Sequence, residues 1–280
     1  MRDPLQAPRW VHWTLIALAM LVVAFLLVMP LAMVLGAAFR EGVGVWFAAL
    51  VEPDARAALR LTLVTAAIVI PLNAFFGMAT AWAVTRFEFR GKQVLLALID
   101  LPFAVSPVVA GLCLVLLFGR EGWFADLLAR YNVQVLFAPP AIVLATLFIT
   151  FPFVARELIP LMEQQGAEEE LAARSLGAGA WHVFRRVTLP NIKWALLYGV
   201  LLCGARAMGE FGAVSVVSGH IRGLTNTLPL HIEILYNEFH ATAAFAVASL
   251  LAALALVTLV VRFWLEARHG DALARAHRRH

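Results

Sequence analysis

The sequence predicts an all-α membrane protein with six transmembrane helices and both termini in the cytoplasm. Hydrophobic residues make up 62% of the 280 residues and charged residues only 14%, whereas about 25% of the residues in a soluble domain are charged. Apolar runs of the roughly 20 residues needed to cross a bilayer recur along the chain. Too little sequence remains between them for a soluble domain, so residues 1–280 are predicted to form a single transmembrane domain.

Six apolar runs predict the individual spans. The first is too long for the core of a signal peptide and is followed by no obvious cleavage site, so we expect it to remain in the protein. Pro71 and Pro152 predict kinks in the second and fourth spans. The runs cover residues of about 13–39, 59–85, 94–119, 138–162, 191–217 and 241–266.

The third run contains an unusual segment, residues 100–111, in which Pro102 and Pro107 remove helix hydrogen bonds and bend the span. The freed carbonyls must be satisfied by Ser106, by water or by another helix, as happens where a broken helix lines a cavity or an interface. Asp100 is then either a hydrogen-bonded residue between helices, which we favour, or a contact for a substrate. Asp100, Ser106 and Pro107 are candidates for the wall of a translocation path.

A charged, glycine-punctuated segment of about 163–190 separates the fourth and fifth runs. Three glutamates, 168–170, suit the positive end of a short helix and Arg174 suits its negative end. Gly177 and Gly179 are predicted to break this helix, and Pro190 is predicted to open the fifth span, where its missing N–H has no consequence. The pattern favours a small helical protrusion that presses against a soluble partner.

Arg206 and Glu210 lie four residues apart in the fifth run, on one face of a helix. Counted from Lys193, Arg206 is about 20 Å deep, beyond the middle of a roughly 30 Å core. It is taken as the only Lys or Arg well inside a span. The pair is either a structural ion pair or part of a translocation path that attracts an anion transiently. Neighbouring glycines allow another helix to approach closely, at positions Gly204, Gly209 and Gly212.

Basic residues set the orientation, because they concentrate in cytoplasmic loops. With six spans, six Lys or Arg residues fall on one side: Arg40, Arg56, Arg60, Arg120, Arg130 and Arg222. Fifteen fall on the other: Arg2, Arg9, Arg86, Arg90, Lys92, Arg156, Arg174, Arg185, Arg186, Lys193, Arg262, Arg268, Arg275, Arg278 and Arg279. The termini and the 163–190 segment are therefore expected in the cytoplasm, and the net charge of +4 reflects topology in a lipid bilayer and no nucleic-acid partner.

Motifs for chemistry are missing from the sequence. It has no G-x-x-x-x-G-K-[ST] phosphate loop, no H-E-x-x-H and no G-x-S-x-G. Cys113 and Cys203 both lie inside spans, where a thiol behaves as a small hydrophobe. We expect no catalytic residue, no metal site and no cofactor in this chain. The chain is predicted to be a transport subunit driven from outside and not an enzyme.

The 163–190 segment resembles the EAA loop of permease subunits in ATP-binding-cassette importers. That pattern reads E-A-A, three residues, G, nine residues, a branched aliphatic residue, one residue, then L-P. The matching positions are Ala172, Ala173, Gly177, Val187, Leu189 and Pro190. Leu171 holds the place of the glutamate, and Glu170 lies one position earlier. The resemblance implies that these eight residues couple the permease to an ATPase.

Across almost the whole chain, the sequence resembles sulfate/thiosulfate permeases of the CysW type, through residues 100–111, 184–191 and 206–219. The resemblance implies that residues 1–280 form a single permease domain with the type I fold of ATP-binding-cassette importers. It also implies a bacterial inner-membrane heterodimer with a second permease of the CysT or CysU type. It further implies two cytoplasmic ATPase subunits of the CysA type, which bind ATP and Mg, and a periplasmic sulfate- or thiosulfate-binding protein. Two alternatives stay open: a molybdate or tungstate permease, and a membrane scaffold that transports nothing.

Overall fold

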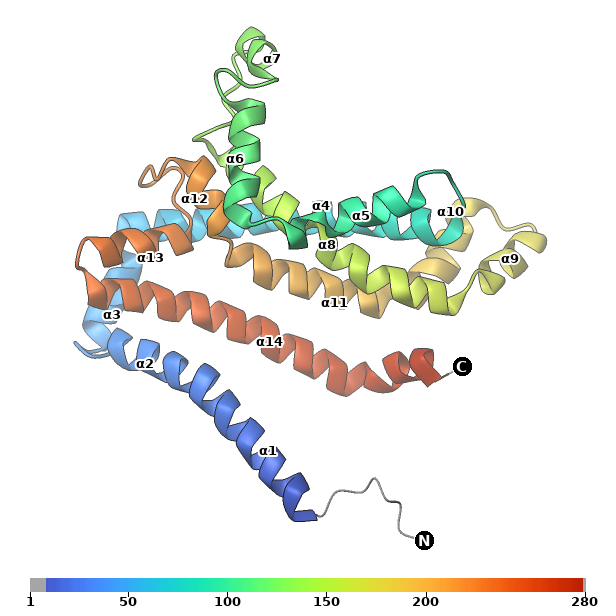
Figure 1. Ribbon diagram of the computed structural model, residues 1–280, viewed down its shortest axis with the longest axis horizontal. Helices are drawn as coiled ribbons and strands as arrows, with labels where there is room; N and C mark the ends of the chain where they lie inside the picture. The colour runs from blue at the N-terminus through green and yellow to red at the C-terminus, as the bar shows by residue number, and fades with distance from the viewer. Residues whose placement is uncertain (1–8, 279–280) are drawn as a thin grey trace.

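The computed structural model describes residues 9–278, with backbone alone for Arg9, Arg262 and 265–278 (Figure 1). Every regular element in this range is helical, as the composition predicts. The elements are α1 (Arg9–Val23), η1 (Ala24–Val28), α2 (Met29–Ala38), α3 (Val43–Val51), α4 (Pro53–Arg86), α5 (Lys92–Ala104), α6 (Pro107–Phe118), α7 (Ala125–Arg130), α8 (Pro139–Gln165), α9 (Glu168–Ser175), α10 (Ala180–Val183), η2 (Phe184–Thr188), α11 (Leu189–Met208), α12 (Gly212–Ser218), α13 (Leu228–Asn237) and α14 (Ala241–Arg278).

The centre of the molecule is a bundle of α4, α8 and α11. Apolar side chains such as Leu158 and Ile192 are fully buried between these helices. Asn73 on α4 donates hydrogen bonds to Thr150 Oγ1 on α8 (2.7 Å) and Cys203 Sγ on α11 (3.4 Å). Such interhelical bonds contribute about 0.6 kcal/mol each in a membrane bundle, so they add specificity to a bundle packed mainly by shape.

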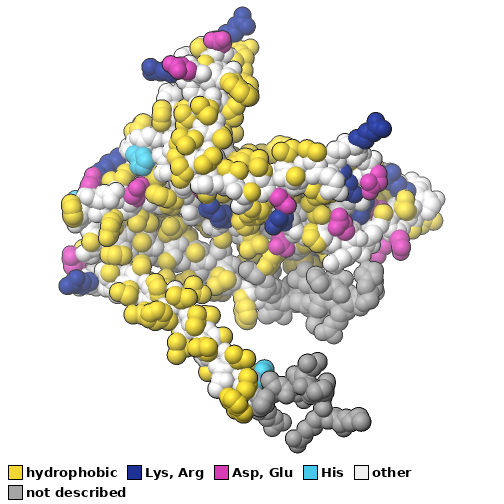
Figure 2. Space-filling model, viewed as in Figure 1, with side chains coloured by type: hydrophobic (Ala, Val, Ile, Leu, Met, Phe, Trp, Pro, Cys, Tyr) yellow, Lys and Arg dark blue, Asp and Glu magenta, His cyan; other side chains and the backbone are white. Residues whose placement is uncertain are grey.

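Five helical stretches are long and apolar enough to cross a membrane, and a sixth exists if α5 and α6 count as one. The first, from α1 to α2, runs obliquely away from the bundle in Figure 1, and its most apolar window has no buried residue. This stretch therefore exposes a largely apolar surface, seen as the hydrophobic side chains at the lower left of Figure 2, while its α2 end packs against α14. The others are 53–86, 139–165, 180–208 and 241–261.

The third predicted span is broken more sharply than a kink. Helices α5 and α6 meet at 112°, so that α6 and α7 project sideways from the bundle in Figure 1. The break falls at Val105 and Ser106, whose ψ angles of 133° and 135° are extended. Because the ring of Pro107 clashes with a helical residue before it, Ser106 is driven out of the α region.

The fifth predicted span, 191–217, has different boundaries in the structure. The helix already begins at Ala180 and continues through η2 to Met208, so the prediction that Pro190 opens a span is wrong. The π-helical turn η2 ends two residues before Pro190, and η1 likewise ends two residues before Pro30. A wider turn accommodates the proline, which lacks an N–H and clashes with the carbonyl four residues earlier.

The same span also ends earlier than predicted. Helix α11 stops at Met208, and 212–218 form the separate helix α12. Phe211 between them is non-helical, with φ −124°. Glu210 Oε1 accepts a hydrogen bond from the N–H of Ala213 (2.9 Å) and so caps α12. A side chain that satisfies a free N–H of the second helix stabilises the break.

The two ends of the bundle differ in their elements. Helices α9 and α10 and the end of α14 lie at one end, whereas α3 and α13 lie at the other (Figure 1). This arrangement agrees with the prediction that the 163–190 segment lies on the same side of the bundle as the outer ends of the first and last spans. Arg2 and Arg279, and the side chains of Arg9, Arg262, Arg268, Arg275 and Arg278, lie outside what the structure describes.

Candidate functional site

The coupling segment, residues 163–190, forms a protrusion at one end of the bundle (Figure 1). Its helix α9 carries the three glutamates in its first turn and Arg174 in its last, as the sequence predicts. Gly177, with φ +87°, turns the chain after α9. Three apolar side chains are largely exposed: Leu171 (63%), Leu176 (90%) and Trp181 (72%). Exposed apolar groups at the tip of a polar protrusion indicate a docking surface for another protein.

Glu170 ties α9 to the bundle. Its carboxylate lies 2.9 Å from Arg86 Nε and 3.3 Å from Arg86 Nη2 at the end of α4, and it accepts a hydrogen bond from Thr188 Oγ1 at 2.8 Å. Arg86 also donates to the carbonyl of Met162 on α8 (3.0 Å). The side chains of Arg86 and Glu170 are only 10% and 15% exposed. Glu170 therefore serves an intramolecular ion pair, while Leu171, at the place of the pattern's glutamate, faces outward.

Some of the other EAA-loop positions are exposed on the docking surface, and the rest pack partly against the protein. Ala172, Gly177 and Pro190 are exposed, and Ala173, Val187 and Leu189 are half-buried. Asn191 donates to Glu169 Oε2 (2.7 Å), a second tie between α9 and the base of α11. Both ties come from the first turn of α9 and attach this short helix to the end of α4 and to the N-terminal half of the 180–208 helix, which suits the transmission of force.

We expect Glu170→Gln to loosen α9 without unfolding the bundle. The change leaves the nearly buried Arg86 without its carboxylate, and losing a charged hydrogen-bond partner costs about 1–3 kcal/mol. Hydrogen exchange of the α9 amides should accelerate accordingly. Glu168→Gln is the matched control, because Glu168 is an exposed glutamate of the same turn. Equal exchange in the two variants would show that the ion pair does not hold α9.

The two broken spans meet in space. A Cβ on Gly212 would lie 2.9 Å from Cβ of Pro107, and one on Gly111 would lie 2.8 Å from the carbonyl oxygen of Ala213. Glycine is therefore required where α6 crosses α12. Ser106 occupies the N-cap of α6 without a side-chain capping hydrogen bond. The sequence singled out both segments but carried no sign that they touch.

Arg206 and Glu210 form the predicted ion pair, with 2.6 Å between Nη1 and Oε2. Glu210 is 1% exposed, whereas the Arg206 side chain is 35% exposed. They do not share one helix, since Arg206 lies in the last turn of α11 and Glu210 follows the end of that helix at Met208. Glu210 thus bridges α11 and α12, and Arg206 keeps an accessible guanidinium edge beside the break. These contacts show that the ion pair has a structural role. The exposed edge of Arg206 remains accessible to an anion.

Asp100 forms an ion pair with Arg156 on α8, at 2.7 Å from Nε, which agrees with the favoured interpretation of Asp100 as a bonded residue between helices. The Arg156 guanidinium also lies 4.8 Å from the ring centre of Phe103. The sequence-based count of basic residues assigned Arg156 to a cytoplasmic connection, so Arg156 was not identified as a candidate site residue. Counted from Gln165, it lies about 13 Å inside α8, so Arg206 is not the only arginine within a span. Its position inside the fourth apolar run was the available signal.

Residues 9–278 contain no group of three His, Cys, Asp or Glu side chains arranged to hold a metal ion. The polar groups near the broken spans are instead two arginine–carboxylate pairs, Arg206–Glu210 and Asp100–Arg156. Both arginines are partly exposed, which is costly in lipid and favours a watery path or a protein interface. Such an arrangement suits transient electrostatic contact with an anion and offers no bond-breaking chemistry.

Comparison with known proteins decides the family. Residues 73–270 match the family described as "Binding-protein-dependent transport system inner membrane component". The chain belongs to this family. The permease is therefore a multi-pass membrane subunit of a transporter and not itself an enzyme.

Relatives and a solved structure agree with this assignment. The permease is 50% identical to the "Sulfate transport system permease protein CysW" of Synechocystis sp. over 93% of this chain and 94% of that protein. It is 36% identical to the CysT permease protein of Escherichia coli, over 90% and 91% of the two chains. A bacterial alginate ABC transporter, solved with its periplasmic protein, matches with a TM-score of 0.73 at 15% identity, covering 93% of this chain and 94% of that one. This last likeness shows the fold alone.

Proposed function

We propose that the permease translocates sulfate or thiosulfate across the bacterial inner membrane as one subunit of an ATP-binding-cassette importer. The observation that carries the proposal is the 50% identity, over nearly the full length of both chains, to a sulfate transport permease. The side chains fit an anion, because the partly exposed charges include two guanidinium groups, Arg206 in a broken span and Arg156 beside the other. Guanidinium is the side-chain group best suited to binding oxyanions.

The proposed complex has four core subunits and a soluble partner. The likeness to both CysW and CysT proteins supports a pair of related permeases. Two ATPase subunits, which bind ATP and Mg, would dock on the coupling segment through Leu171, Leu176 and Trp181. A periplasmic binding protein would deliver the anion at the opposite end of the bundle. This arrangement places α9 and both termini in the cytoplasm.

The contacts of α9 suggest how ATPase motion reaches the bundle. A push on α9 is passed by Glu170 to Arg86 at the end of α4 and to Thr188 at the base of the 180–208 helix. These helices carry the force inward, the second of them to the break at Gly209–Phe211. ATP binding would close the ATPase dimer and open the bundle outward to receive the anion. Hydrolysis and product release would reset it.

The path would hold its cargo weakly. Arg206 and Arg156 each already have a carboxylate partner, so an arriving dianion competes with Glu210 and Asp100. Ser106 and Pro107 lie at the helix break beside α12 and complete the proposed wall. Weak binding favours rapid release, so selectivity would reside in the binding protein.

Arg156→Gln is expected to lower the maximal uptake rate about tenfold, equivalent to roughly 1.4 kcal/mol on the barrier. The reason is loss of one of two accessible positive charges along the path. Initial rates of labelled sulfate uptake into vesicles, normalised to assembled complex, measure the effect. Arg130→Gln on α7 removes the same charge from an exposed helix outside the path and should leave the rate unchanged. An uptake rate for Arg156→Gln within twofold of wild type would exclude it from the path.

The decisive experiment is ATP-dependent uptake by the purified complex with its binding protein in vesicles. Labelled sulfate accumulation supports the proposal. Stimulation of ATP hydrolysis by molybdate or tungstate but not by sulfate would reassign the substrate. A complex that accumulates no oxyanion would point to a scaffold.

A further inference from the structure

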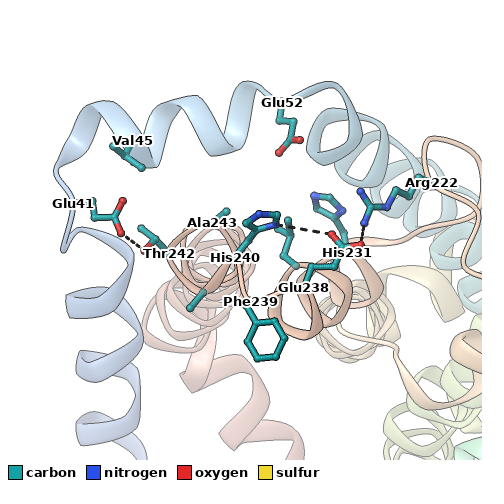
Figure 3. Close-up of a pocket in the computed structure, with 12 residues that line it drawn as sticks. Glu41, Val45, Glu52, Arg222, His231, Glu238, Phe239, His240, Thr242 and Ala243 are labelled. Atoms are coloured by element: carbon teal, nitrogen blue, oxygen red, sulfur yellow. Dashed lines mark hydrogen bonds and ion pairs between the residues drawn. The ribbon is translucent and has the colours of Figure 1, made fainter.

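The end of the bundle opposite α9 contains a cavity of about 440 Å³. It lies among α3, α13, the start of α14 and the connection before α13 (Figure 3). Its lining combines apolar side chains with six charged or titratable residues: Glu41, Glu52, Arg222, His231, Glu238 and His240. None of these residues contributes to the coupling segment or to the broken spans. The cavity is therefore a separate feature that the transport path leaves unexplained.

The cavity has an excess of negative charge. Arg222 is bound by Glu238 and lies 3.9 Å from Asp54. Glu41 accepts a hydrogen bond from Thr242 Oγ1 (2.7 Å), and His240 Nδ1 lies 3.9 Å from the second oxygen of Glu238. Glu52 is exposed and has no ion-pair partner among residues 9–278. Arg222 thus balances one of several carboxylates, and its own binding shows that the cavity accommodates a guanidinium.

His231 adds an unsatisfied acceptor to these carboxylates. It is 1% exposed, lines the cavity, and neither of its ring nitrogens has a hydrogen-bond partner among the side chains and backbone that the structure describes. Burial lowers the pKa of His231, so at neutral pH its imidazole is uncharged and one nitrogen is a free acceptor. A buried polar group without a partner costs about 1–3 kcal/mol. An N–H donor that enters the cavity would recover this energy.

The rim of the cavity carries an exposed aromatic residue. Phe239 is 94% exposed and has φ +65°, a backbone conformation that bulky residues rarely adopt. Strained backbone of this kind concentrates at functional sites. Aromatic residues, Phe included, are enriched at protein–protein interfaces, so an exposed phenylalanine beside a charged pocket suits contact with another protein. In Figure 3 the ring of Phe239 points away from Glu41, Glu52 and His240, toward the outside of the cavity.

We propose that this cavity receives a lysine or arginine side chain of the soluble binding protein, with Phe239 packing on that partner's surface. The proposal rests on the proposed function, in which this end of the bundle faces the periplasm. Carboxylates together with a neutral acceptor select a cationic N–H donor and repel oxyanions and anionic lipid headgroups. Complementary charge at a rim governs encounter rate and orientation, so the cavity would orient the loaded binding protein over the path.

The test is the affinity of the binding protein for the assembled importer in nanodiscs. Glu52→Lys should weaken binding at least tenfold and flatten its dependence on salt. Glu121→Lys is the matched control, because Glu121 is an exposed glutamate near α7, outside the cavity; it should change the affinity less than twofold. Glu41→Lys, on another element of the same cavity, replaces Glu52→Lys if that variant fails to assemble. Replacing the matching basic residue of the binding protein by Glu should restore binding to Glu52→Lys.

Three results would overturn the proposal. Wild-type affinity for the binding protein in both Glu52→Lys and Glu41→Lys would show that the cavity does not bind it. Equal losses of affinity in Glu52→Lys and Glu121→Lys would show that only the net surface charge matters. Stabilisation of the importer by spermidine alone, lost in Glu52→Lys with binding-protein affinity intact, would assign the cavity to a small cation. Sulfate uptake by the wild-type complex is measured in parallel. If the wild type takes up sulfate and the cavity variants bind the binding protein normally, only this inference is refuted. If the wild type takes up no sulfate, the proposed substrate is refuted.

Discussion

Gly177→Asp is expected to abolish sulfate uptake while the helical bundle stays folded. Gly177 has φ +87°, and a Cβ there would meet no atom of this chain within 4 Å. A side chain therefore costs about 1–2 kcal/mol of local backbone strain but creates no clash inside the permease. The new carboxylate would stand on the docking surface next to Leu176, where burying an unpaired charge against a partner costs far more. Association of the ATPase should consequently be lost.

The measurement is the amount of ATPase that co-purifies with the permease, together with uptake and the Tm of the bundle. Gly91→Asp is the matched control, since Gly91 has φ +100°, has open space around it and belongs to the neighbouring 87–91 connection. It imposes similar strain and the same charge outside the coupling segment and should retain the ATPase. Normal uptake in Gly177→Asp would refute the role of this segment.

Arg206→Ala is expected to be the most destabilising single change in the bundle. It leaves Glu210, which is 1% exposed, without its 2.6 Å ion-pair partner. Removing one partner of a buried ion pair costs about 3–5 kcal/mol. The yield of assembled complex and its Tm should fall, and uptake should fall with them. This result alone does not separate a structural pair from a path residue.

The double variant Arg206→Gln/Glu210→Gln makes that separation. The glutamine at 210 keeps a carbonyl oxygen for the N–H of Ala213, so the cap of α12 survives and assembly should recover. Uptake should nevertheless stay about tenfold below wild type, because the positive charge near the break is gone. Recovery of both assembly and uptake would assign the pair to structure and remove Arg206 from the path. The control is Glu88→Gln/Lys92→Gln, which removes a different ion pair. It should change neither the yield of assembled complex nor the uptake rate.

Much of the fold follows from local sequence. Apolar runs of bilayer length predicted the spans, since about 20 consecutive apolar residues cross a bilayer as a helix that satisfies its own backbone hydrogen bonds. The glutamates of α9 and the turn at Gly177 were likewise readable, because capping and positive φ depend on neighbouring residues. Errors occurred where prolines and glycines allowed several outcomes. A proline at 190 is compatible with a helix start or with a π turn inside a helix, and only packing against α4 and α8 selects the second.

Composition and spacing determined by themselves that this chain is built from apolar runs of bilayer length and carries a charged, glycine-punctuated segment at about 163–190, because bilayer length, charge and turn chemistry are local properties. Tertiary structure alone decided that Glu170 pairs with Arg86, that Pro107 meets Gly212, and that Arg156 lies beside Asp100. These contacts join residues far apart in sequence, and their geometry depends on the 112° break and on helix packing. The cavity around His231 belongs to the same class, since its carboxylates come from separate elements brought together only by folding.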